Sequence, residues 1–176
     1  MDYFYSTDER LYFVMPFYKG GNLQEYLKRQ TNGLGRIPDE EQVKSIICQL
    51  VHGIGCLHAN NIIHRDIKLE NLCLDENGYL KIIDFGMTRM LRCGERSNSF
   101  CGTPDYLAPE VVKGEMYDHQ ADVWSIGAVT YELMFGVTPF RNRNLNRMYQ
   151  NITTGELEIP NQARVPHSDE LRDFLN

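Results

Sequence analysis

The chain lacks the features that would direct it to a membrane, to nucleic acid or into a secretory pathway. Its longest apolar stretch, 123–135, is interrupted by Ser125, Thr130 and Glu132 and is too short to span a bilayer. The 176 residues carry a net charge of −6, whereas nucleic acids and anionic membranes attract basic surfaces. The first residues do not place a basic segment before an apolar one, as a secretory signal does. We therefore expect a soluble, intracellular protein of the cytoplasm, with no nucleic-acid or membrane partner.

Cysteines spaced for a metal and loops built for phosphate are also missing. The five cysteines show no metal-ligand spacing and cannot all pair, so reduced thiols are expected: Cys48, Cys56, Cys73, Cys93 and Cys101. No glycine-rich phosphate-binding loop precedes His64, and no predicted strand carries a lysine placed to pair with phosphates. The chain by itself is therefore poorly equipped to clamp a nucleotide.

The apolar pattern predicts a mainly helical α+β domain with a few short strands. Residues 10–17 are rich in aromatic and aliphatic side chains, which indicates a strand. Asn22 has the form of a helix cap for a short helix to about residue 30, and a loop is expected over 31–36. Pro38 opens the strongest of three further helices, which are expected over 38–58, 122–134 and 145–153.

Three polar motifs follow one another in a fixed order. Residues 64–71 read His-Arg-Asp-Ile-Lys-Leu-Glu-Asn, residues 84–86 read Asp-Phe-Gly, and residues 108–110 read Ala-Pro-Glu. Each motif alone could occur by chance, but their joint order and spacing is typical of protein kinases. Over essentially its whole length, the chain resembles the large lobe of eukaryotic serine/threonine protein kinases. The resemblance implies that 1–18 is the end of the small lobe and the hinge, with 19–176 the large lobe, truncated before its last helices.

A predicted hairpin connects the first two motifs. Its strands, 72–74 and 79–83, surround the pair Asn77-Gly78, which is a strong signal for a tight turn. The hairpin places Asn71 and Asp84 at neighbouring strand ends, as two ligands of one metal ion would require.

The resemblance implies the catalytic roles. Asp66 would accept or orient the proton of the substrate hydroxyl, and Lys68 would neutralise the migrating phosphoryl group. Asn71 and Asp84 would hold Mg²⁺ at the phosphates of ATP. Thr103 would be a partner of Asp66 and Lys68 rather than a phosphorylation site. The alternative interpretation of these residues is a solvated polar loop with no catalytic role.

Two further acids would have architectural roles. Asp122 lies in a predicted apolar helix, where a buried carboxylate needs hydrogen-bond donors. By resemblance, it would hold the backbone of the catalytic loop. Glu110 would pair with an arginine beyond the following helices, and we expect it to be unpaired here because the sequence ends at Asn176.

The loop that ends in Ala-Pro-Glu is similar to that of the group containing the cyclic-nucleotide-dependent kinases. The resemblance implies that Ser99 is an activation-loop phosphorylation site and that Arg65 and Arg89 bind its phosphate. The alternative is an exposed serine in a flexible loop.

The resemblance also implies how the nucleotide base is bound. Met15 would be the gatekeeper of the hinge, and the Pro16 carbonyl and the Tyr18 amide would face adenine. Cys73 would lie beneath the adenine, where its small side chain is expected to pack rather than react.

Two acids fall on positions that bind basic substrate side chains in the resembling group. These are Glu70 and Glu132, while a third such position is Asn22, which already has a sufficient role as a helix cap. A protein substrate that is basic around the acceptor residue is therefore expected.

Two functions remain open. The chain is expected to be a catalytic region that transfers the ATP γ-phosphoryl group to protein serine or threonine, together with a missing small lobe or a regulatory subunit. Because it lacks the covering loop and the strand lysine, the isolated chain is expected to be weak or inactive. The alternative is a non-catalytic, kinase-like module that docks partners. An unrelated nucleotide-binding enzyme is disfavoured, because no Gly-x-x-x-x-Gly-Lys loop is present.

Overall fold

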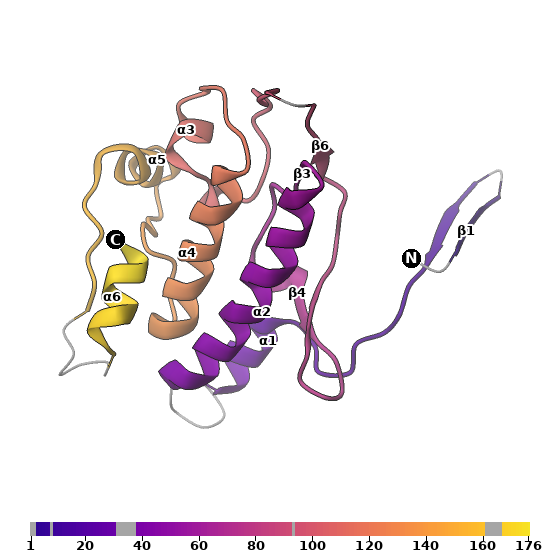
Figure 1. Cartoon of the computed structure of the whole chain (residues 1–176), viewed down its shortest axis with the longest axis horizontal. Coiled ribbons are helices and arrows are strands. Elements are labelled where there is room, and N and C mark those ends of the chain that lie inside the picture. Colours follow the sequence, from indigo (N-terminus) through magenta and orange to yellow (C-terminus); the bar gives the residue numbers. More distant parts are fainter. Residues whose placement is uncertain (1–2, 8, 31–37, 93, 161–166) are drawn as a thin grey trace.

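Two long helices, α2 (Glu40–Ala59) and α4 (Gln120–Phe135), pack against each other at the centre of the fold (Figure 1). This computed structural model describes residues 3–7, 9–30, 38–92, 94–160 and 167–176, and the loop predicted over 31–36 lies outside them. The remaining described helices are α1 (Leu23–Lys28), η2 (Leu69–Asn71), η3 (Pro104–Tyr106), α3 (Pro109–Val112), α5 (Leu145–Thr154) and α6 (Asp169–Leu175). The described strands form antiparallel pairs: β1 (Tyr3–Ser6) with β2 (Leu11–Val14), β3 (Ile62–Ile63) with β6 (Arg89–Met90), and β4 (Leu72–Leu74) with β5 (Leu80–Ile82). The predicted mostly helical fold with small sheets is confirmed.

Helix α2 begins at a capping box. The Asp39 carboxylate accepts a hydrogen bond from Gln42 N at 2.9 Å, and the Gln42 side chain accepts one from Asp39 N at 3.3 Å. The prediction that Pro38 opens the helix was therefore wrong by two residues, because the cap at Asp39 satisfies the free N–H groups of the first turn. Most of the apolar face expected on α2 is buried, whereas Val51 is 46% exposed. The buried residues are Val43, Ile46, Ile47, Leu50 and Ile54.

Helix α4 is buried around most of its circumference. Its side chains Val129, Leu133 and Met134 are almost fully buried in the main core. The helix ends at Gly136, whose φ of +77° is a left-handed conformation that glycine adopts without strain. The helices predicted over 122–134 and 145–153 are thus both confirmed, with small shifts of their ends.

The hairpin of β1 and β2 lies apart from the helical body in Figure 1. Of the strand predicted over 10–17, only Leu11–Val14 is formed, and Pro16 beyond it has no N–H to donate to a ladder. The chain then reaches the body at Gly20, whose N–H donates to the Leu74 carbonyl at 3.1 Å. Helix α1 follows, and Asn22 caps it as predicted by accepting from Glu25 N at 2.9 Å.

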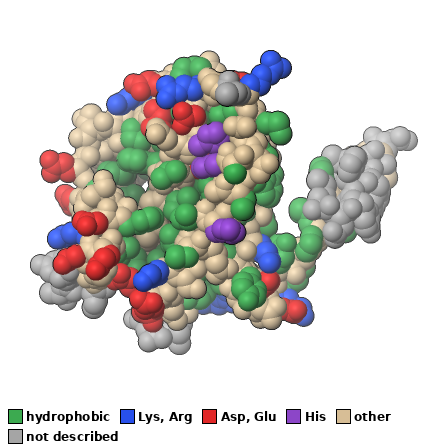
Figure 2. Space-filling model, in the orientation of Figure 1, with side chains coloured by type: hydrophobic (Ala, Val, Ile, Leu, Met, Phe, Trp, Pro, Cys, Tyr) green, Lys and Arg blue, Asp and Glu red, His purple; other side chains and the backbone are tan. Residues whose placement is uncertain are grey.

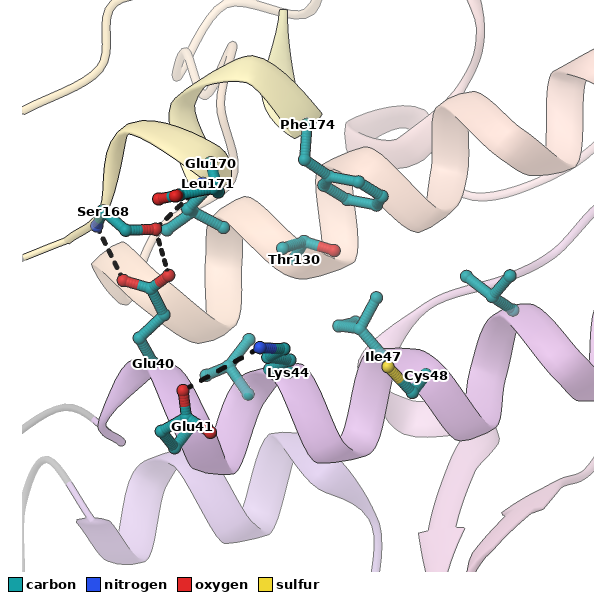
Figure 3. Close-up of a pocket in the computed structure, with 12 residues that line it drawn as sticks. Glu40, Glu41, Lys44, Ile47, Cys48, Thr130, Ser168, Glu170, Leu171 and Phe174 are labelled. Atoms are coloured by element: carbon teal, nitrogen blue, oxygen red, sulfur yellow. Dashed lines mark hydrogen bonds and ion pairs between the residues drawn. The ribbon is translucent and has the colours of Figure 1, made fainter.

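Helix α6 was not predicted, and it is held by contacts at its N-cap residue, Ser168. The Ser168 hydroxyl accepts from Leu171 N at 3.1 Å and donates to the Glu40 carboxylate, which also accepts from Ser168 N at 2.7 Å (Figure 3). Between α2, α4 and α6 lies an open hollow of about 700 Å³ with mostly apolar walls, including Ile47 and Phe174.

Surface charge is mixed on the face drawn in Figure 2. Acidic and basic side chains are interspersed there, and the coloured atoms of this face form no single basic field. Among the helices in the described ranges, none combines the length and the apolar character that crossing a membrane requires.

Candidate active site

Asp66 lies at the centre of a polar cluster in the catalytic loop, residues 64–71. Its Oδ1 accepts a hydrogen bond from the Thr103 hydroxyl at 2.7 Å, and its Oδ2 lies 2.9 Å from Lys68 Nζ. Asn71 Nδ2 donates to Asp66 Oδ2 at 3.0 Å and to the Asp66 carbonyl at 2.8 Å. Lys68 Nζ also donates to the Thr103 hydroxyl at 2.8 Å. The structure therefore brings the four residues predicted as catalytic into one hydrogen-bonded group.

The donors around Asp66 favour its ionised form. The residue is only 6% exposed, and this burial opposes ionisation. Hydrogen bonds from Lys68, Thr103 and Asn71 outweigh the burial, so the pKa of Asp66 lies below its usual value. A carboxylate that is ionised at neutral pH can orient or accept the proton of an incoming hydroxyl.

Thr103 reaches Asp66 because Gly102 allows a close approach of two backbones. Gly102 has a φ of +113°, and a Cβ at this position would lie 2.7 Å from the Arg65 carbonyl oxygen. Only a glycine fits there without a shift of one chain. The segment from Asp84 to Glu110, which we call the activation segment, is thereby held against the catalytic loop.

Asn71 and Asp84 are placed at neighbouring positions by the β4–β5 hairpin. Ile83 N donates to the Asn71 carbonyl at 2.9 Å, one residue before Asp84. Asp66 binds the Asn71 side-chain nitrogen, so the Asn71 side-chain oxygen has no hydrogen bond with the described residues. The exposed Asp84 carboxylate accepts, among the same residues, only from Gly86 N, at 3.1 Å. An amide oxygen and a carboxylate suit Mg²⁺ when phosphates and water complete the shell, so these residues fit that ion. Within the described ranges, no group of three or more His, Cys, Asp or Glu side chains forms a metal centre by itself.

Asp122 holds the backbone at the start of the catalytic loop. This carboxylate is 1% exposed and accepts hydrogen bonds from His64 N and Arg65 N, both at 2.8 Å. The contacts stabilise Arg65 at a φ of +70°, an uncommon conformation for a residue with a side chain. His58 Nε2 also lies 2.8 Å from Asp122 Oδ2, a partner 64 residues away that no local pattern indicated.

The Asp-Phe-Gly motif packs on the catalytic loop through its aromatic ring. Phe85 meets the His64 ring edge-on, with 5.3 Å between the ring centroids. Burial lowers the pKa of His64, although nearby Asp122 and Asp66 act in the opposite direction. The neutral ring is thus part of the packing that joins the two motifs.

Ser99 is partly exposed, and its backbone is fixed by a neighbouring side chain. The Tyr117 hydroxyl donates to the Ser99 carbonyl at 2.8 Å. Arg65, the first cation predicted to bind a phosphate there, donates from Nε to the Met87 carbonyl at 2.5 Å and from Nη1 to Ser97 Oγ at 3.5 Å. The second contact is long and therefore weak.

Arg89, the second cation predicted to bind that phosphate, is paired with Glu95. Arg89 Nη2 lies 2.6 Å from Glu95 Oε1, and Glu95 Oε2 accepts from Arg92 N at 2.8 Å. These bonds, the Arg92 backbone first and Arg89 second, lower the pKa of Glu95. Sequence reasoning missed Glu95, although an acid among several arginines is a signal that could have indicated it.

Glu70 and Glu132, the acids predicted to bind substrate, both influence the pKa of Tyr106. The Tyr106 hydroxyl donates to Glu132 Oε2 at 2.5 Å, and Gln24 Nε2 donates to Glu70 Oε1 at 2.9 Å. Burial raises the pKa of Glu132, and the charges of Glu70 and Asp105 raise it further against the Tyr106 bond. Burial raises the pKa of Tyr106, and the negative charges of Glu132 and Glu70 raise it further. Glu70 Oε2 is buried and has no hydrogen-bond partner among the described residues.

The residues predicted to face adenine follow β2 in an extended segment. Met15 is 65% exposed, Pro16 is exposed and Tyr18 is half-buried. Cys73 is buried and forms an isolated bridge with Asn22, which lies across it. Burial, with a smaller contribution from a nearby glutamate, raises the pKa of the Cys73 thiol, as expected for a packing group.

Glu110 lines an open hollow of about 1000 Å³ beside α4. The Trp124 and Phe140 rings stack nearly in parallel in its wall, with centroids 5.7 Å apart. In the described part of the chain, the Glu110 carboxylate has no hydrogen-bond or ion-pair partner.

Comparison with known proteins agrees with this geometry. The family model described as "Protein kinase domain" matches residues 1–176, so the chain belongs to the protein kinase domain family, among the serine/threonine kinases. Mouse "Serine/threonine-protein kinase Sgk2" is 39% identical over 175 residues, which are 99% of this chain and 46% of that protein.

Two nematode relatives extend this similarity. Caenorhabditis elegans "Protein kinase C-like 1" is 38% identical over 150 residues, 84% of this chain and 21% of that protein. "Serine/threonine-protein kinase akt-2" of the same species is 37% identical over 163 residues, 92% of this chain and 30% of that protein. These relatives are AGC kinases, which confirms the group predicted from the activation loop. The chain spans less than half the length of these curated relatives.

Proposed function

We propose that this chain is the catalytic lobe of a serine/threonine protein kinase that transfers the γ-phosphoryl group of ATP to a protein hydroxyl. The observation that supports this most is the contact of Asp66 with Lys68, Asn71 and Thr103. A carboxylate kept ionised beside an ammonium group suits a reaction that deprotonates a hydroxyl and moves an anion. A purely scaffolding function does not require an ionised, buried carboxylate at Asp66.

Each polar residue has a defined part in the proposed reaction. Asp66 orients the acceptor hydroxyl and takes its proton, while Thr103 and Lys68 hold Asp66 in place. The Lys68 side chain, 21% exposed, offers its charge to the phosphoryl group as that group moves. Asn71 and Asp84 are the residues that would hold Mg²⁺, which supplies positive charge at the phosphates when bound.

The proposed nucleotide contacts involve more than the catalytic loop. Met15, Pro16 and Tyr18 would meet the adenine, with Cys73 beneath it. Residues 1–63 contain no glycine-rich loop, so the phosphates need a covering element from a small lobe or a regulatory partner. Without that element, the chain is proposed to bind nucleotide poorly and to transfer phosphate slowly.

The proposed substrate is a protein segment with basic residues near the acceptor serine or threonine. Glu70 and Glu132 lie close enough that the charge of Glu70 raises the pKa of Glu132, and Glu70 retains one buried oxygen without a partner among the described residues. Buried acceptors of this kind are normally satisfied, which favours a cationic group from a ligand. Ser99 is proposed as a phosphorylation site that Arg65 and Arg89 would bind.

The function is tested by following transfer of the ATP γ-phosphate to a peptide that contains one serine. The assay uses this chain alone and the chain joined to the small lobe of mouse Sgk2. We expect little transfer by the chain alone and clear transfer by the joined protein, with none to the matching alanine peptide. Nucleotide binding by the joined protein without any transfer would favour the non-catalytic module instead.

A further inference from the structure

The Gln24 side chain lies between an acid and a base. Its Nε2 donates to Glu70 Oε1 at 2.9 Å, and its Oε1 accepts from Lys28 Nζ at 3.0 Å. A carboxylate only accepts and an ammonium group only donates, so both contacts are hydrogen bonds in one orientation of the amide alone. Gln24 and Lys28 are one turn apart on α1, whereas Glu70 is 46 residues later, in η2.

The neutral amide separates Lys28 from Glu70. A direct ion pair between these two residues would neutralise the carboxylate and occupy its oxygens. Gln24 instead satisfies one oxygen of Glu70 and leaves the negative charge in place. Glu132 likewise receives a hydrogen bond from a neutral group, because the Tyr106 hydroxyl donates to one of its carboxylate oxygens at 2.5 Å. Both acids therefore have a fixed position, and neither forms an ion pair within 4 Å with a cation of the described residues, so both remain available to a cationic ligand.

We propose that Gln24 is a positioning residue that sets the preference of this kinase for a basic substrate side chain. The inference rests on the proposed function, in which Glu70 and Glu132 bind that side chain. Gln24 does not touch the reacting atoms. It fixes the Glu70 carboxylate and prevents Lys28 from forming an ion pair with it. The substrate cation therefore does not have to displace Lys28 from Glu70.

The expected consequence of losing the amide follows from the reach of lysine. In Gln24→Leu, the donor to Glu70 and one acceptor of the Lys28 ammonium group disappear together, while leucine keeps a good helix former on α1. The Lys28 side chain can then turn to the Glu70 carboxylate. A basic substrate has to displace it, whereas a neutral substrate is unaffected.

The test measures binding of two fluorescein-labelled peptides to this chain by anisotropy. One peptide has a serine preceded by two arginines, and the other has citrulline, a neutral isostere, in place of both arginines. The measured quantity is the ratio of the two affinities. We expect wild type to prefer arginine, and Gln24→Leu to lower the preference about three- to tenfold, with unchanged binding of the citrulline peptide.

A second substitution separates positioning from a general structural effect. Adding Lys28→Met to Gln24→Leu removes the competing cation, so the arginine preference should return to within about twofold of wild type. Gln24→Lys places a cation directly at Glu70, and its loss of preference should persist when Lys28→Met is added. Gln150→Leu, an exposed glutamine on α5, is the matched control and should leave the ratio unchanged.

The outcomes distinguish this inference from the proposed function. An unchanged ratio in Gln24→Leu, or a loss that Lys28→Met does not restore, would overturn the positioning role. If Glu70→Gln and Glu132→Gln also leave the ratio unchanged, the proposed basic substrate class is wrong, and the inference is overturned with it. Neither result bears on the phosphate-transfer assay, which tests catalysis separately.

Discussion

The Thr103 hydroxyl donates to Asp66 Oδ1 at 2.7 Å, although the two residues are 37 positions apart in the sequence. This contact joins the activation segment to the carboxylate that we propose as catalytic. Lys68 bonds to both residues, so the three side chains form a closed triangle. Movement of the activation segment therefore changes the surroundings of Asp66 directly.

Thr103→Val should raise the pKa of Asp66, because one of the donors that lower it is removed. In wild type, the ionised carboxylate contributes stability above its unfolded value near 3.8, and that contribution is lost as the pH falls through the lower folded value. The carboxyl carbon of Asp66, followed by NMR during titration, reports the change. Thr103→Ser keeps the hydroxyl and should titrate like wild type; identical titrations in all three proteins would contradict the account.

Asp122→Ala should destabilise the fold by about 3–5 kcal/mol, because His64 N and Arg65 N lose their buried acceptor and His58 loses its partner. Unfolding in urea measures the loss. Asp173→Ala is the control, since this exposed acid on α6 should change the free energy of unfolding by less than about 0.5 kcal/mol. Similar values for the two variants would show that Asp122 does not support the loop.

Glu132→Gln should raise stability at neutral pH while it weakens binding of basic peptides. Burial raises the pKa of Glu132 above its unfolded value near 4.5. The stability that this group contributes is therefore complete below that value and is lost as the pH rises through the folded pKa. Melting temperatures from pH 4 to pH 8 test this, because the glutamine variant should lack the decline that wild type shows. A parallel decline in both proteins would rule out Glu132 as its source.

Glu95→Gln should loosen the activation segment, because Arg89 loses its ionic partner. We expect cleavage by trypsin after Arg92 to become roughly two- to fivefold faster, in line with an exposed ion pair. The control is Glu115→Gln at another exposed acid, and this variant should be cleaved at the wild-type rate. A phosphate on Ser99 that binds Arg89 would replace Glu95 as its ionic partner, so Arg89 would remain paired and phosphorylated wild type should resist the protease at least as well as the unmodified protein. Equal cleavage rates of Glu95→Gln and Glu115→Gln would show that Glu95 does not order the activation segment.

Elements with strong local signals could be predicted from the sequence. The hairpin of β4 and β5 follows from Asn77-Gly78, where Gly78 takes a φ of +83°. Helix α4 follows from a long apolar segment that ends at Gly136. The grouping of Asp66, Lys68, Asn71 and Thr103 was expected only from the resemblance to protein kinases, since Thr103 is 37 positions from Asp66 and no local signal indicates their contact.

Features that depend on distant contacts could not be predicted. Helix α6 has seven residues, and its cap is bound by Glu40, 128 positions away. The contact of Gln24 with Glu70 joins α1 to the catalytic loop without any local pattern. The beginning of α2 was misplaced because Pro38 and Asp39 are both favourable near a helix start, and only the hydrogen bonds distinguish them.

The most direct test of the account is the effect of Asp66→Asn on phosphate transfer. The chain joined to the small lobe of mouse Sgk2 is mixed with ATP and a serine peptide, and the rate of a single turnover is measured for wild type, Asp66→Asn and the exposed control Asp173→Asn. We expect Asp66→Asn to be slower by about 10² or more while ATP and peptide affinities stay the same, because the proton acceptor is lost without loss of shape. Equal rates for wild type and Asp66→Asn would contradict the proposal that Asp66 carries the chemistry.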